Sequence, residues 1–465
     1  MNGRDGADPE LLHDLLSALC STGADWAEVF LQESRGAHVE ALAEGGADAR
    51  EGLVSGAGLT LELDGRTCFR SVDGLSPEAL LREARALAQS IGGGAAAPVA
   101  PLARRPAREI CPALRPPAAT SLSEKEALVR DTLEAAARAP GFRSGSVLLK
   151  DVSSVVAVAN SDGVFTQEDQ HSVTLYAQVT LAEGERSAAG SRVISAAGGV
   201  EHLGEEARRR LALDAAEAAR FALAAGPVPE GELPVVLSPF AAGQVLHEAL
   251  GHLLEADSLI RGLSPLGGPG EGLVAAPCLN LEDDGSLPGL RGSADYDDEG
   301  WPTGPVTLMS EGRVTGLLTD RASAARLGLP RTGHARRESY RSPASCRMRN
   351  LTLRPGERAQ EELMRGIPFG IHAVRVGAGR SDLEAGTFAF LLTEGYLIRE
   401  GRPSEAVGGA VLEGRFWDVL LGIQEAASEV ERHPGVCARD GQGVGVSDGS
   451  PAIRLAKILV RRRAQ

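Results

Sequence analysis

The sequence predicts an α+β protein with two domains. Its 465 residues are enough to bury two separate hydrophobic cores. The first half alternates helical patterns with strand-like runs, whereas the second half consists mostly of short strands separated by Gly and Pro. We therefore expect an α/β N-terminal domain over residues 1–228. A largely antiparallel β domain, which carries one histidine-bearing helix, is expected over residues 229–465.

Helix, strands and helix are expected in that order over the first ninety residues. Residues 8–23 ("DPELLHDLLSALCSTG") have the apolar spacing of a helix and stop at a Gly. Residues 23–34 and 56–74 are typical of strands, the second range with a Gly-containing turn. Residues 76–94 open with Ser-Pro and end in glycines, which are helix start and stop signals. Residues 92–118 are rich in Gly, Ala and Pro and predict an extended connector.

The remainder of the first half is expected to be a helix, several strands and a long helix. Residues 121–139 begin with Ser-x-x-Glu, the signature of a capped helix. Strand patterns follow over residues 145–151, 153–165 and 171–190, with Asn-Ser-Asp-Gly as a turn. Residues 203–226 read as a long helix that ends at a Gly followed by Pro.

A Pro- and Gly-containing break separates the two predicted domains. The strand "PVVLS" follows this break and leads into the helix with the sequence "QVLHEALGHLLEAD", residues 244–257. Downstream, residues 304–320, 387–403 and 451–460 read as strands between Gly and Pro. This composition suits an antiparallel β domain.

The histidine-bearing helix carries His247, Glu248 and His252. The familiar zinc-peptidase helix has His-Glu-x-x-His, with both rings on one face; here the second His comes one residue later. In an ideal helix the two side chains would point about 140° apart. Two devices could still bring them to one ion: an approach to the bare backbone at Gly251, or a single π-type turn. The sequence does not choose between them.

A simpler interpretation is that both histidines are solvated on a polar helix face, since short motifs arise by accident. A catalytic zinc usually has three protein ligands and a water. Candidates for the third ligand are Glu255, Asp257, the acidic cluster at residues 295–299, or a distant His or Cys. The six cysteines are scattered without CxxC pairs, which is typical of reduced thiols.

A wider resemblance favours the metal site. The segment "HEALGHLLEAD" is similar to the metal helix of the TldD/PmbA family of zinc metallopeptidases, in its metal-bearing TldD-type branch. Further segments resemble the family in the same order over most of residues 232–460: "RGSADYDDEGWPT", "GLLTDRASAARLG", "TGHARRESYRSP", "RMRNLTLRPGE", "FLLTEGYLIREG" and "GVCARDGQGVGVSDGSPAIRL". The chain departs from the family at Leu253 and Ala256, where glycines are expected.

The resemblance implies a role for each matching residue. His247 and His252 match the family's histidine ligands to zinc, Cys437 matches its third ligand, and Glu248 matches its catalytic glutamate. It also implies a dimer, either a homodimer or a heterodimer with a metal-less PmbA-type relative. Active sites in the family lie in enclosed channels that admit extended or unfolded peptides.

Substrate contacts are expected in the arginine-rich segment "RTGHARRESYRSPASCRMRN". Its arginines could hold a peptide carboxylate or backbone carbonyls, or they could pair with nearby acids in a solvated loop: Arg336, Arg337, Arg341, Arg347 and Arg349. Because "GHARRESY" resembles a family segment, Arg337, Glu338 and Tyr340 are the predicted substrate-binding residues.

The sequence thus predicts a Zn²⁺-dependent peptidase with a role in peptide processing or maturation. In this enzyme, Glu248 is expected to move the proton of a metal-activated water. The alternative is a non-catalytic peptide-binding or modulator subunit of a protease complex. A net charge of −15 gives no reason to expect nucleic acid or an anionic membrane as partner. No apolar run is long enough to span a bilayer and the start lacks a signal peptide pattern, so we expect a cytoplasmic protein without membrane contact.

Overall fold

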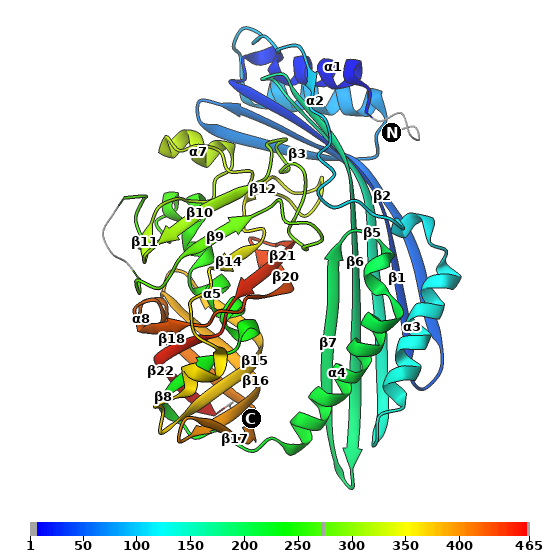
Figure 1. Ribbon diagram of the computed structural model, residues 1–465. Helices are drawn as coiled ribbons and strands as arrows, with labels where there is room; N and C mark the ends of the chain where they lie inside the picture. The colour runs from blue at the N-terminus through cyan, green and yellow to red at the C-terminus, as the bar shows by residue number, and fades with distance from the viewer. Residues whose placement is uncertain (1–6, 271–274, 463–465) are drawn as a thin grey trace.

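The computed structural model describes residues 7–270 and 275–462 (Figure 1). Its N-terminal half is built on one seven-stranded sheet, in the order β3-β2-β1-β5-β6-β4, with β7 also paired to β6. Its strands are β1 (Trp26–Leu42), β2 (Ala47–Leu63), β3 (Arg66–Asp73), β4 (Ala103–Arg104), β5 (Phe142–Asn160), β6 (Val164–Glu183) and β7 (Arg186–Ala197). All pairings are antiparallel except that of the short β4 with β6. The prediction of an α+β protein is confirmed, whereas the α/β label for this half is corrected: hairpins join most of its strands.

Four helices cover this sheet: α1 (Pro9–Leu19), α2 (Pro77–Ile91), α3 (Leu122–Ala137) and α4 (Glu205–Ala224). The start signals act as expected. Ser76 caps α2 by accepting from the Ala79 amide, and Ser121 and Glu124 form a capping box on α3. Residues 92–118 contain no strand other than β4, in agreement with the predicted connector.

The central strands are so long that one sheet supports two hydrophobic cores. β1, β2, β5 and β6 have 17, 17, 19 and 20 residues, which corresponds to ~60 Å of extended chain. On β1, Val29 and Leu31 pack in the core with α1 and α2, whereas Val39 lies in the core with α3 and α4. Because alternate residues face opposite sides, Phe30 points to the other face and packs with Tyr340 of the C-terminal half.

A small closed barrel forms one part of the C-terminal half. β8 pairs with β15 and β22, β22 with β18, β18 with β16, and β16 with β15, which closes a five-stranded ring. Its strands are β8 (Gly231–Leu237), β15 (Phe369–Asp382), β16 (Thr387–Arg399), β18 (Ala410–Arg415) and β22 (Ile453–Arg462), with β17 (Arg402–Val407) and β19 (Ile423–Ala426) attached. Only β8 and β15 run parallel in this ring, so the predicted antiparallel character is confirmed.

A second, six-stranded sheet has the order β11-β10-β9-β14-β21-β20. Its strands are β9 (Leu281–Asp284), β10 (Pro305–Ser310), β11 (Arg313–Val314), β14 (Leu351–Leu353), β20 (Glu431–Arg439) and β21 (Gln442–Ser450), and a separate small pair is formed by β12 (Ala335–Arg336) and β13 (Ser345–Cys346). The helices are α5 (Pro239–Ala249), α6 (Ala256–Ile260), α7 (Arg321–Leu327) and α8 (Phe416–Gly422). α5 packs against both β15 and β21 and so lies between barrel and sheet.

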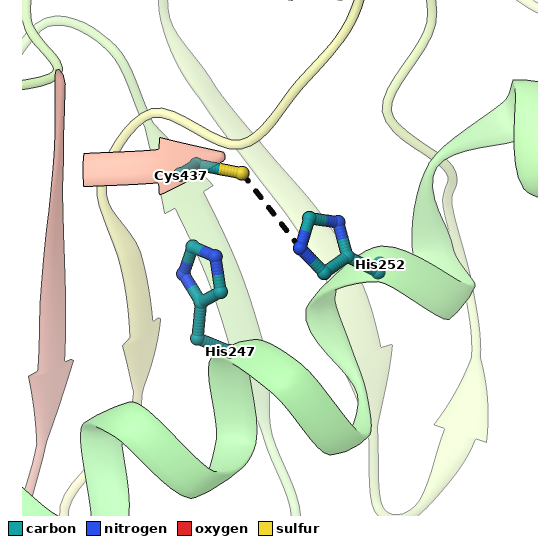
Figure 2. A group of neighbouring side chains, drawn as sticks. All are labelled: His247, His252 and Cys437. Carbon is teal, nitrogen blue, oxygen red and sulfur yellow. Dashed lines mark hydrogen bonds between the residues drawn. The ribbon is translucent and has the colours of Figure 1, made fainter. Parts of the chain in front are cut away.

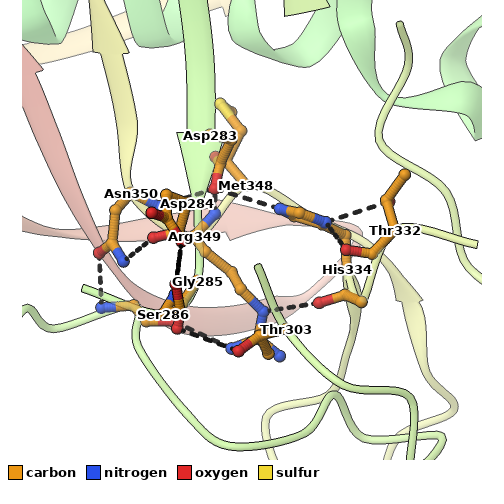
Figure 3. A network of polar contacts seen from close by, with 12 residues as sticks. Asp283, Asp284, Gly285, Ser286, Thr303, Thr332, His334, Met348, Arg349 and Asn350 are labelled. Carbon is orange, nitrogen blue, oxygen red and sulfur yellow. Dashed lines mark hydrogen bonds and ion pairs between the residues drawn. The ribbon is translucent and has the colours of Figure 1, made fainter. Parts of the chain in front are cut away.

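A buried carboxylate holds the loops beside the six-stranded sheet (Figure 3). Asp283 accepts hydrogen bonds from the backbone amides of Arg349 and Asn350, both at 3.0 Å, and from His334 Nε2 at 3.1 Å. His334 Nδ1 in turn donates to the Thr332 carbonyl at 2.8 Å. Burial raises the pKa of Asp283, but the donated hydrogen bonds outweigh this effect and leave the pKa below its usual value. The carboxylate therefore stays charged and fixes the segments that carry Arg336 and Arg349.

Within the described residues, no helix is both long and apolar enough to cross a bilayer. This agrees with the absence of a long apolar run in the sequence.

Candidate metal centre

The helix that carries the histidines is shorter than its sequence pattern. Ser238 caps α5 by accepting from the Ala241 amide, and Pro239 occupies its first turn. The helix ends at Ala249, because Leu250 adopts φ −135° and ψ −45°, outside helical conformation. A 3-10 turn over Gly251–Leu254 follows and carries His252. Both predicted devices, the π-type turn and the ion approach at Gly251, are therefore wrong: a break in the helix reorients the second histidine.

Gly251 has a packing role instead. A Cβ at this position would collide with the Met348 sulfur and crowd Leu351. The glycine thus allows the chain to turn tightly against the core rather than opening a path for an ion. Nor do the histidines lie on a solvated helix face, since both His247 and His252 are only 5% exposed.

The break brings the two imidazoles together with a distant cysteine (Figure 2). The ring centroids of His247 and His252 are 5.1 Å apart and the rings are perpendicular. Cys437, on β20, is also buried and places its Sγ 3.7 Å from His252 Nε2. One ligand atom from each of the three residues lies within 4.8 Å of the others. The predicted group of two histidines and one cysteine is therefore assembled by the fold.

Two carboxylates orient the imidazoles from behind. His247 Nδ1 donates to Asp448 Oδ1 at 2.8 Å, and His252 Nδ1 donates to Glu255 Oε2 at 3.1 Å. Each Nε2 is thereby left to face the shared space, which is the usual arrangement for metal-binding histidines. Glu255, a candidate third ligand in the sequence, instead supports His252 and also accepts from Arg439. Asp448 is the functional residue that sequence reasoning missed.

The pKa values of these three side chains are shifted by one another and by the carboxylate partners of the histidines. Burial would lower the pKa of His247, but Asp448 and the Cys437 sulfur outweigh it and hold that pKa well above its usual value. The pKa of His252 is raised to about 9, since Glu255 and Cys437 outweigh burial. Burial raises the pKa of Cys437, yet the two neighbouring histidines lower it to about 7. The two imidazoles are therefore protonated around a thiolate, and a metal ion that binds here would displace their Nε2 protons.

The donor set and its spacing fit a zinc ion. With Zn–N of about 2.0–2.1 Å and Zn–S of about 2.3 Å, tetrahedral geometry separates N and S ligands by roughly 3.6 Å. The observed separation between Cys437 Sγ and His252 Nε2 is 3.7 Å. A set of one thiolate and two imidazoles suits Zn²⁺ rather than Mg²⁺ or Ca²⁺ and leaves a fourth position for water.

Glu248 follows His247 on α5 and is half-buried. Its Oε2 accepts a hydrogen bond from Ser381 Oγ, on β15, at 2.5 Å. Ser381 also lines a cavity of about 900 Å³ at the end of the barrel. The carboxylate thus stands beside a metal ligand and next to an open space, and its catalytic role remains a prediction.

Of the three predicted substrate-binding residues, Arg337 and Tyr340 are buried and Glu338 is exposed. Arg337 is buried and its Nη2 donates to Glu28 Oε1 at 2.5 Å, while its guanidinium lies 4.3 Å from the Phe30 ring. Tyr340 is buried as well, and its hydroxyl donates to Asp73 at 2.5 Å. These two side chains therefore join the two halves of the chain. Glu338 alone of the three is exposed, and its role in substrate binding stays a prediction.

Asp448→Asn is expected to weaken metal binding about 10–100-fold, because a neutral amide no longer orients and polarises the His247 imidazole. Competition against a chromophoric chelator measures the metal Kd. Asp418→Asn is the matched control, since it makes the same change at an exposed aspartate on α8. Equal Kd values for the Asp448 variant and the unmodified chain would contradict a supporting role for this carboxylate.

Comparisons with known proteins agree with this geometry. Residues 230–462 match the model of the PmbA/TldA metallopeptidase C-terminal domain, and residues 115–225 match that of the central domain. A metalloprotease of Methanothermobacter thermautotrophicus is 32% identical over 74% of this chain and 76% of its own length. A metalloprotease TldD homolog of Haemophilus influenzae is 33% identical over 72% of both chains.

Solved structures share the whole fold. TldE from Thermococcus kodakarensis superposes with a TM-score of 0.71 at 18% identity, covering 94% of this chain and 97% of its own. A Thermotoga maritima protein described as a candidate modulator of a DNA gyrase gives a TM-score of 0.77 at 22% identity, covering 94% and 96%. The family models, the relatives and the assembled His-His-Cys group together show that the chain belongs to the TldD/PmbA family of metallopeptidases, in its metal-binding TldD-type branch.

Proposed function

We propose that this metallopeptidase uses Zn²⁺ to hydrolyse peptide bonds of extended or unfolded peptides. The single observation that carries the proposal is the buried group of His247, His252 and Cys437, in which the 3.7 Å between Cys437 Sγ and His252 Nε2 fits tetrahedral zinc. A relative from Saccharolobus solfataricus, 34% identical over 50% of this chain and 53% of its own length, is named a zinc metalloprotease TldD homolog.

The chain's own residues divide the chemistry between them. His247, His252 and Cys437 hold the ion, while Asp448 and Glu255 keep each imidazole in the tautomer whose Nε2 binds it. The zinc, when bound, supplies a polarised water and a Lewis acid for the scissile carbonyl. Glu248 accepts the proton of the attacking water and returns it to the departing amine. The Ser381 hydroxyl holds this carboxylate by one hydrogen bond.

An extended substrate suits the strand that carries Cys437. β20 ends the six-stranded sheet, so its outer edge has no strand partner among the described residues. Backbone amides and carbonyls along such an edge can pair with an extended peptide and tolerate many sequences. An enclosed channel and a role in peptide processing or maturation are further parts of this proposal.

A dimer would cover the helix-free face of the N-terminal sheet. Four large apolar side chains on this face are 37–42% exposed: Val54, Val152, Tyr176 and Val193. Exposed apolar rows of this kind are typical of protein contacts. We propose a second copy of this chain or a metal-less PmbA-type relative as the partner.

Metal removal tests the zinc peptidase directly. The purified chain should cleave an unstructured peptide, lose this activity with a chelator, and regain it with one equivalent of Zn²⁺ but not with Mg²⁺. Full cleavage by a chain whose measured metal content is near zero would contradict the proposal. Tight peptide binding without cleavage at any metal load, alone or with a metal-less relative, would favour the non-catalytic subunit instead.

A further inference from the structure

A cavity of about 570 Å³ lies between the two halves of the chain. On one side it is bounded by residues of the helix-free sheet face, including Gln32, Ser154 and Glu168. On the other side it is bounded by Gly443–Gly445 of β21, the strand paired with β20. The cavity therefore adjoins the hairpin that carries Cys437, although none of the three metal-binding side chains lines it.

The structure separates the arginines of the segment "RTGHARRESYRSPASCRMRN" into two groups. Arg331 pairs with Glu299, Arg337 pairs with Glu28 and Arg341 pairs with Asp73. Arg347 donates to the Arg439 carbonyl and lies 3.9 Å from Asp440. The remaining two, Arg336 and Arg349, line the cavity, as does Arg337, whose charge is paired with Glu28.

Neither of these two guanidinium groups meets a carboxylate. Arg336 Nη1 donates to the carbonyls of Met348 at 2.9 Å and Gly445 at 2.6 Å. Arg349 Nε and Nη1 donate to the carbonyls of Gly333 at 2.8 Å and Gly292 at 2.9 Å. Carbonyl dipoles fix both side chains in place, but within residues 7–270 and 275–462 neither guanidinium forms a direct ion pair with a carboxylate.

Arg291 also lines the cavity. Its side chain lies close to Gly445, where a Cβ would come within 2.8 Å of Arg291 Cζ. Within residues 7–270 and 275–462, its side chain has no hydrogen bond or ion pair. Burial lowers the pKa of Arg291; burial together with the positive charges of Arg349 and Arg291 lowers that of Arg336 to about 9. The carboxylate of Asp298 raises the pKa of Arg336 but does not outweigh these effects.

Two acidic side chains on the cavity lining accept hydrogen bonds from backbone amides. Asp295 accepts from the backbone amides of residues 108–110, and Asp298 accepts from the Arg337 amide. Burial and these two carboxylates raise the pKa of Glu168 to about 7. The other acids on the lining are Glu109, Asp169 and Glu338. In the part of the chain that the structure describes, none of the six carboxylates forms an ion pair with Arg291, Arg336 or Arg349.

Strand register relates the arginines to the metal group. Cys437 pairs with Val444, and Val436 pairs with Gly445. Since paired residues share a face and neighbours alternate, Cys437 Sγ lies on one face of the hairpin and Arg291 on the other. An extended peptide aligned on β20 would also alternate its side chains. If one peptide side chain lies over the metal site, the side chain of the next residue points to the face that carries Arg291. The peptide backbone would then lie about two strand spacings (~10 Å) from β21.

We propose that Arg291, Arg336 and Arg349 form a subsite for a carboxylate of the peptide substrate. The carboxylate is either an Asp or Glu side chain beside the scissile bond or the C-terminal carboxylate of the peptide. This inference rests on the proposed peptidase function, because it places the peptide along β20. It gives the enzyme a preference for acidic or short C-terminal segments, which backbone pairing alone would not produce.

Peptide binding to the Glu248→Gln chain tests the subsite without hydrolysis. Three fluorescent peptides differ only in charge: one with Glu, one with Gln at the same place, and one with Gln and an amidated C-terminus. Fluorescence anisotropy should give a Kd at least 10-fold lower for a carboxylate peptide than for the fully neutral one. The Glu/Gln pair and the free/amidated pair show which carboxylate is bound.

Arg291→Met should remove this preference while leaving the Kd of the neutral peptide unchanged, and Arg291→Lys should retain part of it. Arg341→Met is the matched control, because Arg341 pairs with Asp73 and does not line the cavity. Equal Kd values for all three peptides, or a preference that survives Arg291→Met, would overturn the inference. Absence of hydrolysis by the zinc-loaded wild-type chain would count against the peptidase instead, whatever the Kd values.

Discussion

Glu248→Gln is expected to abolish peptide hydrolysis and to leave the bound metal in place. Gln has nearly the same shape as Glu but no basic oxygen, so it cannot take a proton from water. Loss of a general base lowers kcat by about 10²–10⁴. The ligand atoms of His247, His252 and Cys437 are untouched by the change. We therefore expect one metal ion per chain in both proteins and activity only in the unmodified one.

Metal analysis and kcat, measured on the same preparation, check this expectation. Glu357→Gln makes the same chemical change at an exposed glutamate of the C-terminal half and should leave kcat unaltered. Retention of more than a tenth of the wild-type kcat by the Glu248 variant would show that another group moves the proton. Loss of metal together with activity would instead assign Glu248 to metal retention.

Cys437→Ser is expected to eliminate tight zinc binding and, with it, peptidase activity. Serine keeps the size of the side chain, but its hydroxyl stays protonated near neutral pH and is a poor ligand for Zn²⁺. Only two imidazoles would remain, fewer than the three protein ligands of a typical catalytic site.

Titration with a competing chelator should show the zinc Kd of this variant raised by at least 100-fold. Cys278→Ser is the matched control: Cys278 is half-buried in the same half of the chain, away from the histidines. A thermal unfolding curve of the metal-free protein separates lost coordination from lost folding. Wild-type zinc affinity in Cys437→Ser would refute the three-residue site.

The sequence predicted the fold unevenly, and the strands show why. The helices α1 to α4 were predictable because capping residues, prolines and glycines act locally. The central part of the β1–β2 hairpin, residues 35–55, was not assigned to strands, although β1 continues to Leu42 and β2 begins at Ala47. Small and charged residues dominate there, so the apolar alternation is weak. Pairing with β5, far along the chain, keeps these residues extended.

The candidate site likewise has features that were predictable from the sequence and others that were not. The pattern of His247, Glu248 and His252 is local, and the resemblance to a family pointed to Cys437. The break at Leu250 depends on packing of Gly251 against Met348, almost one hundred residues away. Asp448 gave no signal beyond its place in the segment "GQGVGVSDGSPAIRL", and the pairing of Arg337 with Glu28 left no sign in the sequence.

By itself, the sequence determined the chemistry that is available: two imidazoles, a thiolate and a carboxylate in a protein of mixed α and β structure. Only the tertiary structure decided how these groups meet, which carboxylates support them and which arginines, in the part of the chain that the structure describes, form no direct ion pair. The reason is that coordination and charge pairing depend on distances of a few ångströms between residues that lie as many as 309 positions apart. Local sequence patterns carry no information about such distances.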